Sequence, residues 1–137
     1  DRPTVKYVPQ RTETDCMIAC LAMVTEQSYE QVVEDLDPYL KANPEEGVGN
    51  DAFYEYLAMN GFYVQTIPKF YSPQQKDMSP WPPAAFAPIH VAGVMYDGYH
   101  GVVVDWKGLV YDPCDLAVSS LLEYENVFEI VGIWRKL

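Results

Sequence analysis

Cys16 stands at a point in the sequence where a cysteine can become a nucleophile. It follows Asp15 and opens an apolar run, which predicts a helix from Cys16 to about Thr25 with Asp15 as its N-cap. The unpaired N–H groups and the dipole at a helix N-terminus stabilise a thiolate. Cys20 lies one turn further along without that support. The alternative interpretation of a single helical cysteine is a small buried hydrophobic residue.

A thiolate nucleophile needs a base that later protonates the leaving group, and His100 is the candidate. The sequence Asp-Trp-Lys-Gly at 105–108 favours a type I turn followed by a left-handed glycine, which makes a three-residue hairpin loop. That loop places Val102 opposite Asp112, so His100 lies diagonally on the same face as Asp112, within hydrogen-bond reach. A two-residue loop would put the two side chains on opposite faces. We therefore predict that Asp112 orients His100.

Other histidines and acids compete for these roles. His90 lies in an otherwise apolar predicted strand with no identifiable acid beside it, which indicates a structural histidine. Asp105 is assigned to the turn, and Asp115 ranks below Asp112 because a proline break precedes it. Cys114 is given no role.

Gln10 precedes the candidate nucleophile by six positions. A tetrahedral intermediate needs hydrogen-bond donors aimed at its oxyanion. The side-chain amide of Gln10 and the backbone N–H of Cys16 could supply two such donors. The alternative is an ordinary surface glutamine.

The elements that would position these residues fall into two groups. The pair Ser28 and Gln31 forms a capping box that predicts a second helix, and a third is expected from Asn50, as its cap, to Gly61. A short strand at 62–67 follows. The segment 68–88 holds six prolines, which exclude a central strand and suit either a lid or binding wall or a surface crossover.

The second half of the chain reads mainly as strands. These are expected at 89–95, 100–105, 109–112 and 127–134, with a short helix at 119–124. Helices followed by an antiparallel sheet indicate the α+β class. A chain of 137 residues suits a single domain, 1–137, with one core.

Composition narrows the possible partners and cofactors. The net charge of -11 argues against nucleic-acid binding. The acidity suits either solubility alone or steering of a basic peptide or protein partner. No apolar run approaches the roughly 20 residues of a membrane span. Three irregularly spaced cysteines and two histidines indicate neither a disulfide framework nor a zinc site, so no metal or cofactor is expected. Reduced thiols and no visible signal peptide predict a cytoplasmic location. The sequence leaves the oligomeric state open.

The first part of the chain resembles a known enzyme family. Gln10, then Asp15-Cys16, then the helix Ala19-Cys20-Leu21-Ala22-Met23 resemble the opening of the double-glycine leader peptidases, which are bacteriocin-processing domains, and of their wider papain-like relatives. The valine run after His100 and the pair Asp112-Pro113 are similar to the second part of that pattern.

This resemblance extends from about Pro9 to Pro113 and implies a papain-like cysteine peptidase fold, with N-terminal helices packed on a C-terminal antiparallel sheet. It also implies roles for four residues: oxyanion donor, nucleophile, base and orienter, carried by Gln10, Cys16, His100 and Asp112, respectively.

The functional expectation is a cysteine peptidase or isopeptidase that cleaves an amide of a peptide or a protein tail. Met17 departs from the family pattern, which has glycine after the cysteine. The resemblance therefore supports the fold and the catalytic triad of this chain more strongly than it supports a double-glycine substrate. Two alternatives stay open. One is an amidase or acyltransferase on the same scaffold, and the other is a non-catalytic papain-like binding module, which Met17 hints at.

Overall fold

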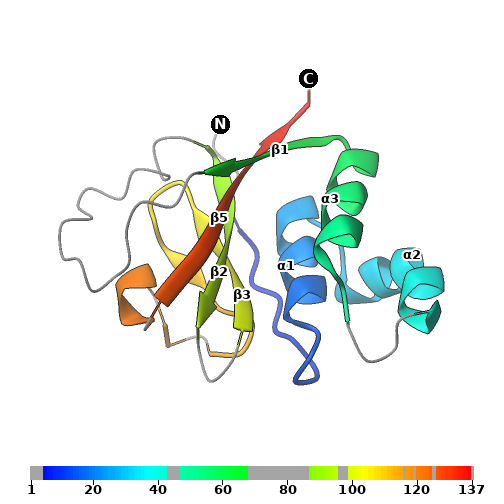
Figure 1. Cartoon of the computed structure of the whole chain (residues 1–137), viewed down its shortest axis with the longest axis horizontal. Coiled ribbons are helices and arrows are strands. Elements are labelled where there is room, and N and C mark those ends of the chain that lie inside the picture. Colours follow the sequence, from blue (N-terminus) through cyan, green and yellow to red (C-terminus); the bar gives the residue numbers. More distant parts are fainter. Residues whose placement is uncertain are drawn as a thin grey trace.

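Helices occupy the first half of the chain and strands the second, as the α+β prediction requires. The structure is a computed structural model that describes residues 5–42, 47–67, 87–95, 99–115, 117–118, 120–124 and 126–136. Figure 1 shows the helices lying on one side of an antiparallel sheet. The elements are α1 (Cys16–Thr25), α2 (Tyr29–Ala42), α3 (Asn50–Met59), β1 (Phe62–Ile67), β2 (Ile89–Met95), β3 (Tyr99–Asp105), β4 (Val110–Tyr111), the 3-10 helix η2 (Leu121–Glu123) and β5 (Asn126–Arg135).

Helix α1 is the central helix of the helical layer, because it is apolar on all sides. Every residue from Ile18 to Thr25 is buried, and the helix contacts α2, α3 and β3. A helix without a polar face must be covered on all sides. Its observed bounds match the predicted ones, so Cys16 is the first residue of the helix.

Asp15 occupies the predicted N-cap position of α1, but its side chain does not cap the helix. Its carboxylate makes no cap hydrogen bond. It accepts hydrogen bonds from the backbone N–H groups of Arg11 and Thr12, each at 2.9 Å. The Tyr29 hydroxyl donates a further bond of 2.5 Å. Asp15 therefore folds the loop that leads into Cys16, and the buried carboxylate is satisfied by these three donors.

The starts of the other two helices follow local capping rules, with one difference. The Ser28 hydroxyl accepts a 3.0 Å hydrogen bond from the Gln31 N–H, as predicted. Asn50 was expected to cap α3, but Gly49 occupies the N-cap position and Asn50 is the first helical residue. Gly61 follows the end of α3 with φ of 85°, a conformation that favours glycine.

The five strands of the sheet run in the order β1-β5-β2-β3-β4. Both faces of the sheet are buried. One face packs under the helices and the other under the segment around η2. The helix-facing cluster includes Val91, Val103, Val131 and Ile133. The opposite cluster includes Ala92, Val94, Val102, Val104 and Ile130 from the sheet, with Val118, Leu121 and Tyr124 covering them. Burial on both faces explains why these strands read as near-continuous apolar runs.

The β3–β4 hairpin has the predicted loop. Val104 pairs with Val110, and Gly108 has φ of 87°. The Asp105 carboxylate accepts hydrogen bonds of 2.9 Å from the N–H groups of Lys107 and Leu109. The three-residue loop and the turn role of Asp105 are therefore confirmed. This register brings the residue after β4, Asp112, to the start of β3.

Most of the proline-rich segment predicted as a lid, binding wall or crossover, residues 68–86, lies outside the described residues. None of the helices that the structure describes has the length and apolar character needed to cross a membrane.

The role of Asp15 in the loop before Cys16 predicts a measurable stability loss. Folding lowers the pKa of Asp15, because hydrogen bonds from Tyr29, Arg11 and Thr12 outweigh the opposing effect of burial. Asp15→Asn should reduce the free energy of unfolding by about 1–3 kcal/mol at pH 7, since an amide cannot accept all three bonds. The contribution of a carboxylate with a lowered pKa is complete above its unfolded value near 3.8 and is lost as pH falls through the folded value.

Urea unfolding of Asp15→Asn between pH 3 and 7 tests this, with Asp37→Asn as the matched control. Asp37 makes an exposed pair with Lys41 at 3.0 Å, and its loss should cost less than about 0.5 kcal/mol. Equal losses in the two variants would contradict the structural role of Asp15.

Candidate active site

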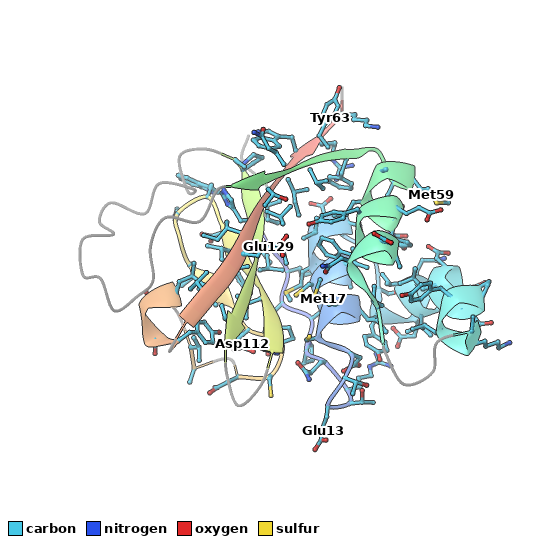
Figure 2. The ribbon with its side chains drawn as sticks, viewed as in Figure 1. Glu13, Met17, Met59, Tyr63, Asp112 and Glu129 are labelled. Atoms are coloured by element: carbon cyan, nitrogen blue, oxygen red, sulfur yellow. The ribbon has the colours of Figure 1, made fainter. Side chains whose placement is uncertain are left out.

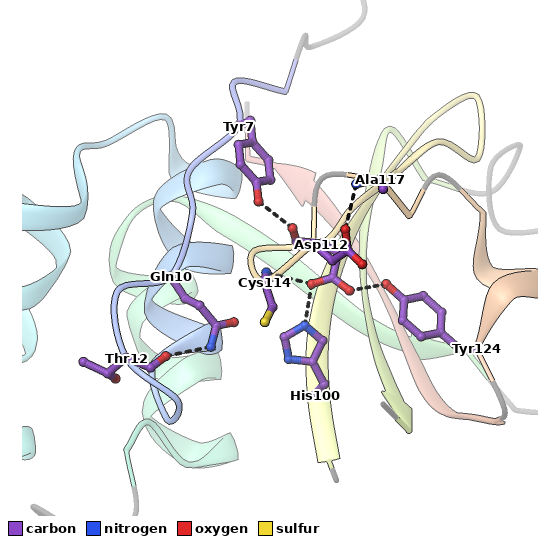
Figure 3. A network of polar contacts seen from close by, with 9 residues as sticks. Tyr7, Gln10, Thr12, His100, Asp112, Cys114, Ala117 and Tyr124 are labelled. Atoms are coloured by element: carbon purple, nitrogen blue, oxygen red, sulfur yellow. Dashed lines mark hydrogen bonds and ion pairs between the residues drawn. The ribbon is translucent and has the colours of Figure 1, made fainter. Parts of the chain in front are cut away.

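His100 and Asp112 form a buried pair at the edge of the sheet. His100 Nε2 lies 2.6 Å from Asp112 Oδ1, and Asp112 is wholly buried. His100 comes from β3 and Asp112 follows β4 (Figure 3). The contact predicted from the hairpin loop is therefore present.

Two further donors hold the Asp112 carboxylate in place. The Tyr124 hydroxyl donates to Oδ2 at 2.5 Å, and the Cys114 backbone N–H donates to Oδ1 at 2.8 Å. The Tyr7 hydroxyl donates to the Asp112 carbonyl oxygen at 2.7 Å. Figure 3 shows these groups converging on Asp112 from both sides. A carboxylate fixed at both oxygens can hold the histidine ring in one orientation.

The sequence analysis did not identify Tyr7 or Tyr124. Tyr7 lies before α1, far from Asp112 along the chain, and Tyr124 follows η2. No spacing rule connects residues from these segments, because their contact depends on tertiary packing. The sequence could have indicated only that a buried tyrosine needs a hydrogen-bond partner for its hydroxyl.

These hydrogen bonds determine the charge state of the pair. Burial alone would raise the pKa of Asp112, but hydrogen bonds from His100, Tyr124 and the Cys114 N–H lower it below its ordinary value. Burial, together with its bond to Asp112, raises the pKa of Tyr124 far above normal. At neutral pH the site therefore contains a carboxylate and a neutral tyrosine donor.

Cys16 approaches the same histidine from the helical layer. It is partly exposed, and its Sγ is 4.0 Å from the point where a Cβ on Gly101, the residue after His100, would lie. Burial lowers the pKa of His100, but hydrogen bonds to Asp112 and to the Cys16 thiol outweigh it and raise the pKa to about 9. Because its pKa is about 9, the imidazole is mainly protonated at neutral pH. Since Nε2 faces Asp112, the Cys16 thiol lies on the Nδ1 side of the ring.

The other two thiols lie in less favourable surroundings. Cys20 is fully buried, and burial, with the nearby Cys16 and Asp112, raises its pKa well above normal. Cys114 is exposed, and slight burial together with Asp112, Asp115 and Cys16 raises its pKa. A raised pKa lowers the thiolate fraction and hence reactivity.

Gln10 lies beside the Asp112 loop but is engaged elsewhere. Its backbone N–H donates to the Pro113 carbonyl at 3.0 Å. Its side-chain Nε2 donates to the Thr12 carbonyl at 2.7 Å, while Oε1 is buried without a hydrogen-bond partner among the described residues (Figure 3). The structure therefore engages one N–H of the predicted oxyanion donor with the Thr12 carbonyl, and the amide has a second N–H.

The rival residues lie in other surroundings. His90 is wholly buried on β2, and burial lowers its pKa to about 4. Neither of its ring nitrogens has a hydrogen-bond partner among the described residues. The Asp115 carboxylate accepts a 2.9 Å bond from the Ala117 N–H. Over the part of the chain that the structure describes, no three His, Cys, Asp or Glu side chains cluster as metal ligands would.

The fold is similar to that of a known peptidase domain. The crystal structure of the peptidase domain of Streptococcus ComA, a bi-functional ABC transporter involved in a quorum sensing pathway, matches with a TM-score of 0.65 and 18% sequence identity. The match covers 97% of this chain and 100% of that one. No protein-family model and no curated protein matches the sequence. At this identity the similarity shows the fold, and the expected α+β, papain-like architecture is confirmed.

Proposed function

We propose that this chain is a cysteine peptidase that cleaves an amide of a peptide or a protein tail. Cys16 would act as nucleophile, His100 as acid and base, and Asp112 as the group that orients His100. One observation carries the proposal: a thiol at the N-terminus of a buried helix hydrogen-bonds a histidine that is itself held by a buried carboxylate. Such a nucleophile–base–orienter series is the signature of covalent acyl transfer.

In the first half of the reaction, the Cys16 thiolate attacks the carbonyl carbon of the scissile amide and forms a C–S bond. The protonated His100 then gives its proton to the leaving nitrogen as the C–N bond breaks, which releases the amine. In the second half, neutral His100 takes a proton from water, and the water oxygen attacks the thioester. The acid product leaves and the thiolate–imidazolium pair is restored.

The oxyanion would be stabilised at the start of α1. Cys16 is the first helical residue, so its N–H has no acceptor inside the helix. Gln10 would add its second amide N–H, with the first kept on Thr12. Two donors near the N-terminus of a helix suit a negative oxygen.

A non-catalytic binding module is the second candidate, and one contact favours it. A Cβ at Gly101 would lie 2.6 Å from Met17 Sδ, so the Met17 side chain packs directly over the strand beside the nucleophile. This residue narrows the cleft relative to a glycine. An amidase or acyltransferase would use the same chemistry up to the thioester and would differ only in the acceptor, an amine instead of water.

The proposed substrate class follows from charge. The chain carries a net charge of -11, which steers basic peptides toward it. The three cysteines are free thiols in the structure, and we propose that the protein acts where Cys16 stays reduced, as in a cytoplasm.

Alkylation kinetics test the thiolate–imidazolium pair. Cys16 should react with iodoacetamide faster than Cys20 or Cys114, and His100→Ala should remove this advantage, because in the proposed pair the protonated His100 assists the thiol. Mass spectrometry of wild type and His100→Ala between pH 5 and 9 measures this, with the exposed Cys114 as an internal control. If Cys16 reacts no faster than Cys114 and His100→Ala changes nothing, the chain is a binding module.

The pH profile of activity tests the role of Asp112. In wild type kcat/KM should fall above pH 9, where His100 loses the proton it must donate. Asp112→Asn removes the negative charge that holds this proton. The alkaline limb should then move down by about 1–3 pH units, and kcat should fall about 10-fold.

Tyr124→Phe is the matched control, because it removes a neighbour of Asp112 but keeps the carboxylate. Its alkaline limb should stay near pH 9, although looser positioning of Asp112 lowers kcat. A limb that stays in place in Asp112→Asn would remove Asp112 from the mechanism.

A further inference from the structure

A groove with a volume of about 460 Å³ lies between α2 and α3. Its lining comes from these two helices and from Asn60, which follows α3, so none of the candidate catalytic residues belongs to it. In Figure 1 both helices lie beyond α1 as seen from β2 and β3. The volume falls within the range of about 300–1,000 Å³ that is usual for binding pockets. This α2–α3 groove is therefore a second hollow, separate from the candidate active site and large enough for side chains of a partner.

The groove has an apolar base and one uncovered apolar side chain. Leu36 and Ala52 line it and are buried. Met59 also lines it and is 78% exposed, more than any other large hydrophobic residue that the structure describes. Figure 2 shows Met59 on the outer side of the helical layer, away from Met17. An unbranched, adaptable side chain beside an apolar hollow suits contact with a side chain of a partner.

Two carboxylates line the same groove without a cation. Asp35 and Glu55 are both exposed. The Asp35 carboxylate accepts hydrogen bonds from the Tyr56 hydroxyl at 2.7 Å and from the Gln31 side-chain amide at 2.8 Å, and both donors are neutral. Burial and the bond to Asp35 raise the pKa of Tyr56 to about 12, so it stays a donor at neutral pH. Among the described residues no basic side chain pairs with Asp35 or Glu55.

The stretch of sequence that forms the groove carries most of the negative charge of the protein. From Tyr29 to Met59 the sequence has eight acidic residues and one basic residue, Lys41, which gives a net charge of -7 (1 − 8) out of -11 for the whole chain. Lys41 pairs with Asp37 at 3.0 Å. A field of this sign attracts basic segments. It repels nucleic acids, anionic membranes and the same face of a second copy of the chain.

We propose that the α2–α3 groove is a docking site for a basic segment of a partner protein. An apolar side chain of this segment would pack against Leu36 and Met59, and its lysine or arginine side chains would pair with Asp35 and Glu55. The apolar contact holds the segment, and the charges select its sign and speed its approach. This site goes beyond the proposed peptidase activity, because it shares no residue with the candidate active site and needs no turnover.

Fluorescence anisotropy with synthetic peptides measures the binding. The probe is a fluorescein-labelled twelve-residue peptide with leucines on one face of a helix and lysines on the other, and every protein carries Cys16→Ser so that the probe is not cleaved. In 0.15 M NaCl, where charges more than about 8 Å apart are largely screened, Kd should lie below about 100 μM. Peptides with glutamine in place of lysine, or alanine in place of leucine, should bind at least about 5-fold more weakly. Absence of saturable binding overturns the proposal.

Two double variants test the charges of the groove. Asp35→Asn with Glu55→Gln should weaken binding of the lysine probe by about 5- to 10-fold. The matched control is Glu34→Gln with Asp51→Asn, which removes two exposed carboxylates from the same two helices outside the groove. The control should change Kd by less than about 2-fold, because its charges do not contact the segment. Equal losses in the two double variants would mean non-specific attraction and overturn the docking site.

Met59→Gln tests the apolar contact and does not depend on Asp35, whose substitution removes an acceptor of two hydrogen bonds. It should weaken binding about 5-fold. Leu109→Gln changes another exposed apolar residue, in the β3–β4 loop, and should leave Kd within about 2-fold. Unchanged binding in Met59→Gln overturns the proposal even if the variant of Asp35 does not fold. Sedimentation velocity without peptide covers the other occupant, since a dimer that Met59→Gln dissociates would assign the groove to a second copy and also overturn the proposal.

Discussion

The site depends on one buried carboxylate. Asp112 is wholly inaccessible to solvent, and burying a charge is costly unless donors and an opposite charge replace water. His100, Tyr124 and the Cys114 N–H supply that replacement. Because the carboxylate stays charged, it raises the pKa of the imidazole that lies between it and the Cys16 thiol. In the proposed mechanism the packing that encloses Asp112 therefore matters as much as the cysteine.

The two layers of the fold each contribute half of the site. The helical layer offers Cys16 at the start of a helix buried on all sides, and the sheet offers His100 and Asp112 at its β3–β4 edge. Backbone bonds tie the halves together: the segment before α1 reaches the Asp112 loop through Tyr7 and Gln10. The candidate site therefore lies at the boundary between the two layers, where α1 contacts β3.

Local rules predicted the parts of this structure that are decided locally. The turn from Asp105 to Gly108 fixed the hairpin register, and the register alone placed His100 beside Asp112. Prediction was weaker where several partners compete for one group. Asp15 has the residue type of a helix cap, yet Tyr29 and the N–H groups of the preceding loop bind its carboxylate instead. The tyrosine that bonds the Asp112 carboxylate was missed because tertiary packing, which no sequence spacing encodes, brings it there.

The contact between Met17 and Gly101 has a consequence for how this sequence can vary over evolution. A Cβ at position 101 would fall 2.6 Å from the Met17 sulfur, so the two positions share one volume. A long side chain at 17 is compatible with glycine at 101, and a larger residue at 101 requires a shorter one at 17. The two positions, on different layers and 84 residues apart in the chain (101 − 17), should therefore change together in descendants of this sequence. The shape of the cleft would be inherited through that pair, while the thiol, the imidazole and the carboxylate stay the same.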